Sequence, residues 1–154
     1  MGAPNAAPCE SSTTALGDWY ATILFWRPQV ALAVNETTRL PVFVPLAPAA
    51  TVVARLMAEV DDAFHAYRLD PAFADAELAQ MTEHRLATTA SRSVVGSMND
   101  FTFLAEAHRE SGDTDLRELS RALATTPCGP LYGSHVSPDR ELAARAAAAA
   151  RADC

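Results

Sequence analysis

The chain has 154 residues, of which 49% are hydrophobic and 20% are charged, a composition typical of one folded domain rather than a disordered chain. Its formal net charge is -7, so it lacks the basic surplus with which nucleic-acid-binding proteins neutralise phosphates, and binding to nucleic acid is disfavoured. It has no apolar run long enough to cross a membrane, no recognisable export signal and no C-x-x-C pair among its three cysteines, which together indicate a cytoplasmic protein.

The first third of the chain has the alternation of a small sheet. Residues 1–15 lack periodicity, and we expect a disordered tail there. The next segments are rich in aromatic and β-branched residues and predict three strands, over Trp19–Trp26, Val30–Val34 and Leu40–Val44. Their short links favour an antiparallel meander. The first strand is apolar on both sides and should be covered on both, whereas Pro41 and Pro45 place the third strand at an edge.

Near residue 50 the apolar spacing changes to that of helices. A stripe of apolar residues follows Thr51, and Asp70-Pro71 ends that helix and starts a second one. Arg85–Ala90 fits either a fourth strand or an extended connector. Further helices are expected in three places: about Ser97–Glu110, after a capping box at Asp115 and Glu118, and over Asp139–Ala152. The last is mostly alanine and should fray or lie against a partner.

This single change of period predicts an α+β fold, in which a small antiparallel N-terminal sheet is covered by four or five helices. The expected organisation is a disordered tail over residues 1–15, a single domain over 16–138, and an alanine-rich terminal helix and tail over 139–154.

The densest polar stretch lies between Thr88 and Phe103. It places six polar or backbone-permissive residues within nine positions: Arg92, Ser93, Gly96, Ser97, Asn99 and Asp100. In a functional interpretation, a helix opens here and its N–H groups bind an anion beside Arg92. In a structural interpretation, Ser93 or Ser97 caps the helix, Gly96 allows close packing, and the Asn–Asp pair ties neighbouring loops together.

A second candidate combines Cys128 with His135, because a Cys/His pair can provide a thiolate nucleophile, with Asn99 or Asp100 orienting the imidazole. Closeness in sequence is not the hydrogen-bond geometry that such a nucleophile needs. The four histidines show no ligand spacing such as H-x-x-x-H, so neither a metal site nor a cofactor is expected. We therefore assign no catalytic residue.

Several blocks of the sequence carry a resemblance. They are GDWYATILFW followed by VNETTR, then SRSVVGSMNDF, and then TPCGPLYG. In this order the blocks resemble an uncharacterised bacterial family with a W-x-A-N-L strand, a V-N-x-x-T-R turn, an R-S-V-L-G-S-M-N-D segment and a T-P-x-G loop. Members of that family occur alone or fused to a plasmid ORF-3-like domain, and they tolerate methionine at the position of Cys128. The resemblance extends from Leu16 to Ser137.

The resemblance implies a grouping and a set of site residues, but no activity. Position by position it indicates Trp19, Asn35, Arg39, Arg92, Ser93, Gly96, Asn99, Asp100, Thr126, Pro127 and Gly129. The chain departs from the pattern at three positions. Thr22 and Ala90 replace asparagines and Thr88 replaces a lysine, which weakens the case for a shared polar or anionic ligand.

We expect the polar blocks to meet at one edge of the sheet, as a cluster that either binds a ligand or is structural. Its members would be Asn35, Arg39, Arg92, Ser93, Asn99, Asp100 and Thr126, with Asp100 paired to an arginine. The favoured function is a small cytoplasmic binding or regulatory module that acts through a protein partner or as a homo-oligomer. The alternative is a small hydrolase or transferase on a phosphate-bearing substrate, with Arg92 as anion clamp and Asp100 as base.

Overall fold

A computed structural model describes residues 16–81, 92–110, 115–131, 133 and 136–152, so the expected N-terminal tail and the segment Arg85–Ala90 lie outside the described residues. Three antiparallel strands form one sheet in the order β1 (Trp19–Leu24), β2 (Val30–Asn35) and β3 (Pro41–Pro45). Trp19 pairs with Asn35 and Leu24 with Val30. The predicted meander is thereby confirmed, and so is the edge position of β3.

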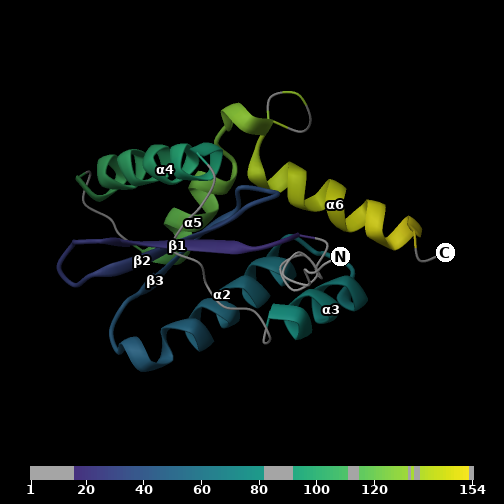
Figure 1. Ribbon diagram of the computed structural model, residues 1–154, viewed down its shortest axis with the longest axis horizontal. Helices are drawn as coiled ribbons and strands as arrows, with labels where there is room; N and C mark the ends of the chain where they lie inside the picture. The colour runs from purple at the N-terminus through teal and green to yellow at the C-terminus, as the bar shows by residue number, and fades with distance from the viewer. Residues whose placement is uncertain (1–15, 82–91, 111–114, 132, 134–135, 153–154) are drawn as a thin grey trace, which may run out of the picture.

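Helices lie on both faces of this sheet (Figure 1). One face carries α2 (Val52–Ala66), preceded by the short 3-10 turn η1 (Ala49–Thr51), and α3 (Pro71–Met81). The other face carries α4 (Arg92–Glu110) and α5 (Leu116–Ala124). A second 3-10 turn, η2 (Gly129–Leu131), leads to α6 (Pro138–Ala152), which contacts α3. The predicted α+β fold is confirmed.

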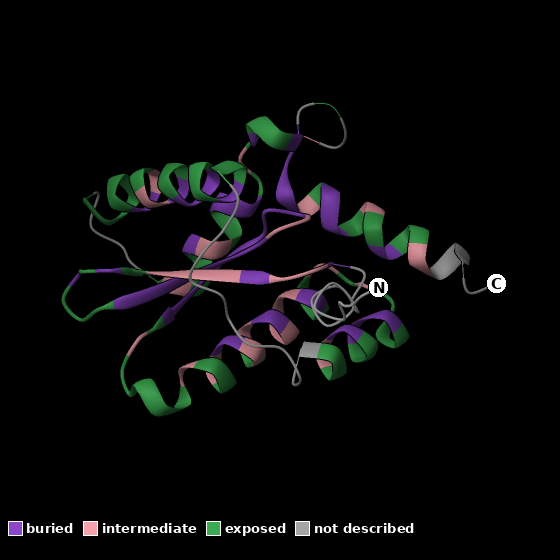
Figure 2. Ribbon diagram, viewed as in Figure 1, coloured by how far each residue is buried: buried purple, intermediate pink, exposed green. Residues whose placement is uncertain are grey.

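The sheet separates two apolar clusters, because successive side chains of a strand point to opposite faces. On the α2 and α3 side, Val42 and Val44 pack with Phe64 and Phe73. On the α4 and α5 side, the core includes Leu32, Val34, Phe43, Met98 and Leu123. Every residue of β2 is buried (Figure 2). A buried aromatic such as Phe64 contributes about 1.5–3 kcal/mol through loss of contact with water.

Two expectations about strand β1 need correction. The strand ends at Leu24 instead of Trp26, and Phe25 is 79% exposed in the turn that follows. Its faces are also not both covered, since Ile23 is 42% exposed. The reason is that β1 lies at the other edge of the sheet, beyond the main contacts of the helices, whereas β2 in the centre is buried throughout.

The start of α4 also differs from expectation. The helix begins at Arg92 rather than near Ser97, so the whole Arg92–Asp100 stretch is helical. Val94 and Met98 lie one turn apart in the core, and this burial outweighs the cost of a glycine inside a helix, about 1 kcal/mol relative to alanine.

The last two helices follow their sequence signals to different degrees. The Asp115 cap of α5 is confirmed, because its side chain accepts hydrogen bonds from the N–H groups of Arg117 and Glu118, but within the described chain the Glu118 side chain does not return the bond that would complete a capping box. Helix α6 has more to bury than expected. Leu142 is fully buried and Ala146 is 4% exposed, so this helix packs within the chain.

Candidate functional site

The turn between β2 and β3 is held by the side chain of Asn35, which is fully buried. Its Oδ1 accepts hydrogen bonds from the N–H groups of Thr37, at 3.0 Å, and Thr38, at 2.9 Å. The Thr38 hydroxyl donates a third bond to the same oxygen, at 3.1 Å. An asparagine at the start of a turn supplies an acceptor that the backbone lacks. These bonds fix the path of the chain up to Arg39.

Arg39 turns into the protein from this loop. Its φ angle is 62°, in the left-handed region that a residue with a side chain adopts only when its surroundings hold it there. Its Nη1 donates to the carbonyl of Glu36, and its Nη2 donates to Ser93 Oγ at 2.7 Å. The residue is 8% exposed, and burial lowers the pKa of its guanidinium, an effect that the nearby Cys128 and Glu36 oppose.

Ser97 and Cys128 extend this polar group into the interior. Ser97 lies one helical turn after Ser93, and its Oγ is 3.6 Å from Cys128 Sγ. Burial raises the pKa of the Cys128 thiol and Asp100 adds to the rise, while Ser97 and Arg39 oppose it. The thiol is therefore kept protonated near neutral pH and is a poor nucleophile. We call these five residues the Arg39 cluster: Asn35, Arg39, Ser93, Ser97 and Cys128.

The structure thus unites only part of the expected site. Asn35, Arg39 and Ser93 meet, whereas Arg92, Asn99 and Thr126 do not join them. Asp100 lies near enough for its charge to raise the pKa of Cys128, but it makes no hydrogen bond with these residues. Asp100 is exposed and pairs with no arginine of the described chain, so the expected Arg–Asp pair is absent from that part. The Thr126 hydroxyl donates locally, to the carbonyl of Ala122.

Helix geometry explains this division. Residues of a helix are spaced about 100° apart around its axis, so Arg92 and Asn99 project almost opposite to the core residue Phe101. Ser93 and Ser97 lie on the flank between these two directions, where they reach Arg39 and Cys128. Sequence reasoning did not bring Ser97 and Cys128 together. The spacing of Ser93 and Ser97 by four residues is the signal that points to a shared helix flank.

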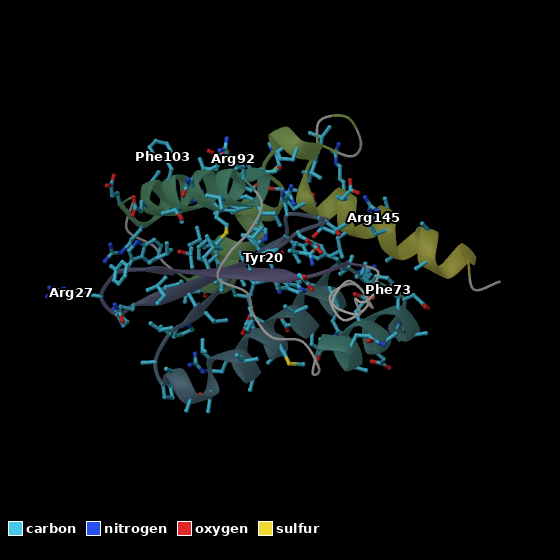
Figure 3. The ribbon with its side chains drawn as sticks, viewed as in Figure 1. Tyr20, Arg27, Phe73, Arg92, Phe103 and Arg145 are labelled. Atoms are coloured by element: carbon cyan, nitrogen blue, oxygen red, sulfur yellow. The ribbon has the colours of Figure 1, made fainter. Side chains whose placement is uncertain are left out.

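The outward side of α4 carries an exposed strip that we call the α4 outer face: Arg92, Val95, Gly96, Asn99 and Phe103. Phe103 is 73% exposed and Val95 is 43% exposed. Figure 3 shows Arg92 and Phe103 on the side of α4 that faces away from the sheet. A methyl group at Gly96 would meet no other part of the described chain within 4 Å. Nothing in the described fold therefore requires a glycine there.

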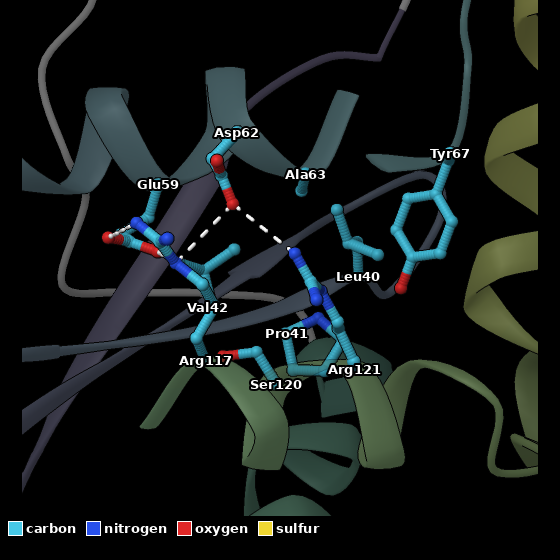
Figure 4. Close-up of a pocket in the computed structure, with 10 residues that line it drawn as sticks. All are labelled: Leu40, Pro41, Val42, Glu59, Asp62, Ala63, Tyr67, Arg117, Ser120 and Arg121. Carbon is cyan, nitrogen blue, oxygen red and sulfur yellow. Dashed lines mark hydrogen bonds and ion pairs between the residues drawn. The ribbon is translucent and has the colours of Figure 1, made fainter. Parts of the chain in front are cut away.

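A second polar region joins α2 to α5 across the edge of β3 (Figure 4). Arg117 donates two hydrogen bonds to Glu59, at 2.9 and 3.1 Å, and lies 3.3 Å from Asp62. Arg121 also contacts Asp62, at 3.4 Å. These partly exposed pairs bound a shallow hollow beside Tyr67, and they hold the two helices over the strand.

The same region closes the sheet at β3. Every second residue of β3 has its backbone amide position directed away from β2; these residues are Pro41, Phe43 and Pro45. The two prolines have no N–H group, and the Phe43 N–H donates to Ser120 Oγ at 3.0 Å. This edge consequently offers no free N–H group for pairing with another strand. We interpret the α2–α5 contact as structural.

The described residues include no group of three His, Cys, Asp or Glu side chains that could hold a metal ion. In the same part of the chain, no helix combines the length and the apolar character needed to span a membrane. Of the proposed Cys128–His135 pair, only Cys128 lies within the described residues.

Comparisons with known proteins place the chain in a family without adding an activity. No curated protein and no solved structure matches it. Residues 2–141 match the family described as Domain of unknown function (DUF6933), which agrees with the resemblance to an uncharacterised domain family seen in the sequence. Because this match covers nearly the whole chain, the protein belongs to that domain family, DUF6933.

Proposed function

We propose that this protein is a small cytoplasmic binding or regulatory module and that a protein partner docks on the α4 outer face. The observation that carries the proposal is the exposure of Phe103 and Val95 on one side of a helix whose opposite side is fully buried in the core. Large apolar side chains that share an exposed strip are typical of protein interfaces, especially where an aromatic residue acts as the anchor.

Gly96 supports the same location. A glycine in the middle of a helix costs about 1 kcal/mol relative to alanine, and here no neighbour within the described chain needs the space. A partner that approaches the helix backbone closely would make use of that space. Arg92 and Asn99 flank the glycine and offer hydrogen-bond donors at the rim of the strip.

The hydrolase or transferase alternative has less support. It requires Arg92, Asn99 and Asp100 to converge on an open pocket, and all three are exposed along the surface of α4. The hollow between α2 and α5 and the one at the junction of α4 with α5 are lined by other residues. Neither of these two hollows is lined by Arg92, the proposed anion clamp, or by Asp100, the proposed base.

Site-specific cross-linking in the native host tests the proposal. A photoreactive phenylalanine analogue replaces Val95 in one strain and the exposed Ala54 of α2 in a matched control strain. We expect one protein adduct at position 95 that is missing at position 54. Adducts of identical composition at both positions, or none at 95, would contradict docking on the α4 outer face. An adduct with a second copy of this chain would identify the partner as the protein itself.

A further inference from the structure

Arg39 is a buried cation without a matching anion. The residue is 8% exposed, and no carboxylate of the described chain lies within ion-pair distance of its guanidinium. Its Nε, which is fully buried, has no hydrogen-bond partner. Its two Nη atoms donate hydrogen bonds to uncharged oxygens, the backbone carbonyl of Glu36 and the hydroxyl of Ser93. An arginine removed from water normally pairs with a carboxylate or a phosphate, because an uncompensated buried charge is costly.

The position of this cation adds to the imbalance. Ser93 is the second residue of α4, so the bond from Arg39 places the guanidinium beside the N-terminal turn of a 19-residue helix. That end of a helix carries a partial positive charge and favours anions. The first turn of α4 contains no acidic residue. The Arg39 guanidinium and the N-terminal turn of α4 are therefore two positive groups side by side, and an anion between them would be stabilised by both.

We propose that this place is a binding site for an oxyanion, the phosphate or carboxylate group of a small ligand. The group would accept hydrogen bonds from the remaining N–H donors of Arg39, whose planar fork matches both anions. The Ser93 hydroxyl would donate to it as well, since its oxygen accepts from Arg39 and its proton has no acceptor in the described chain. Ser93 itself is exposed, which gives the ligand a route to the site.

This site goes beyond the proposed function and does not depend on it. Ser93 lies on the flank of α4, where Arg39 reaches it from the β2–β3 turn, while Phe103 and Gly96 face outward, so a ligand and a protein partner would use different surfaces. Glu36 does not fill the site, because its carboxylate accepts a hydrogen bond from the Asp18 N–H at 2.8 Å.

Thermal unfolding of the full chain with inorganic phosphate, and separately with acetate, at constant ionic strength tests the proposal. A ligand at ten times its Kd raises the unfolding midpoint by about 3–6 °C for a chain of this size. We expect a saturable rise in the parent protein and none in Arg39→Gln. Arg27→Gln, which changes an exposed arginine in the β1–β2 turn, should respond like the parent. A response to phosphate alone or to acetate alone assigns the class of ligand.

Arg39→Gln also removes the hydrogen bonds of Arg39 to Glu36 and Ser93, so a second variant tests the site with Arg39 itself in place. Ser93→Asp places a carboxylate beside Arg39 and in the first turn of α4, so it should act as a built-in ligand. We expect a higher midpoint without any added anion and no further rise with phosphate or acetate. The proposal is overturned if no anion shifts the parent, if Arg39→Gln shifts equally, or if Ser93→Asp lowers the midpoint.

Discussion

Asn35 is the residue whose replacement tests the β2–β3 turn most sharply. In Asn35→Ala, the N–H groups of Thr37 and Thr38 lose their acceptor, and so does the Thr38 hydroxyl. Asn35 and Thr38 are both fully buried, so water does not replace that acceptor without opening the turn. A buried donor left without a partner costs about 1–3 kcal/mol. With the buried N–H and hydroxyl of Thr38 and the partly buried N–H of Thr37 left without their acceptor, we expect a loss of about 3 kcal/mol in the free energy of unfolding.

Urea and thermal unfolding followed by circular dichroism measure this loss. For a chain of this length, it corresponds to a decrease of about 6–12 °C in the unfolding midpoint. Asn99→Ala is the matched control, because it removes the same side chain from an exposed position on α4 and should leave the midpoint nearly unchanged. If Asn35→Ala unfolds at the same temperature as Asn99→Ala, the turn is not held as described and the reasoning fails.

Two further predictions concern the β3 edge and the buried thiol. Ser120→Ala leaves the Phe43 N–H without its acceptor and should lower the free energy of unfolding by about 1–2 kcal/mol, measured in urea; an unchanged midpoint would show that water replaces the serine. Burial raises the pKa of Cys128, so the unfolded chain loses this proton first as the pH rises above the ordinary thiol value of 9.0. Between that value and the raised pKa the folded state binds more protons, and stability should fall as pH rises. Cys128→Ala should flatten this part of the pH profile, and an equally steep profile in that variant would contradict the assignment.

The fold was predictable where one physical signal dominates. The prolines at both ends of β3 restrict that strand to an edge, and the structure has it there. The two short connections leave an antiparallel meander as the simple topology. In contrast, the start of α4 was obscured because Gly96 and its polar neighbours weaken the local helix signal. The helix begins at Arg92 because Val94 and Met98 pack in the core, and these are contacts with distant parts of the chain that the local sequence does not reveal.

The candidate site was less predictable, because its contacts join distant parts of the chain. The bond between Arg39 and Ser93 spans 54 positions, and the contact between Ser97 and Cys128 spans 31. The sequence indicates which residue types carry chemistry, but not how a helix distributes them around its axis. A stretch read as one polar block is divided by α4 into a flank that joins the Arg39 cluster and an outer face that includes Arg92.

Gly96→Gln tests the central claim, that a protein partner docks on the α4 outer face, most directly. Glutamine favours a helix more than glycine does, and a side chain at this position meets no other part of the described chain within 4 Å, so the unfolding midpoint should rise by about 1–2 °C. A side chain forced into a closely packed contact costs about 1–3 kcal/mol, so the yield of the partner adduct from position 95 should fall by about tenfold or more. A higher midpoint with an unchanged yield of that adduct would contradict the claim.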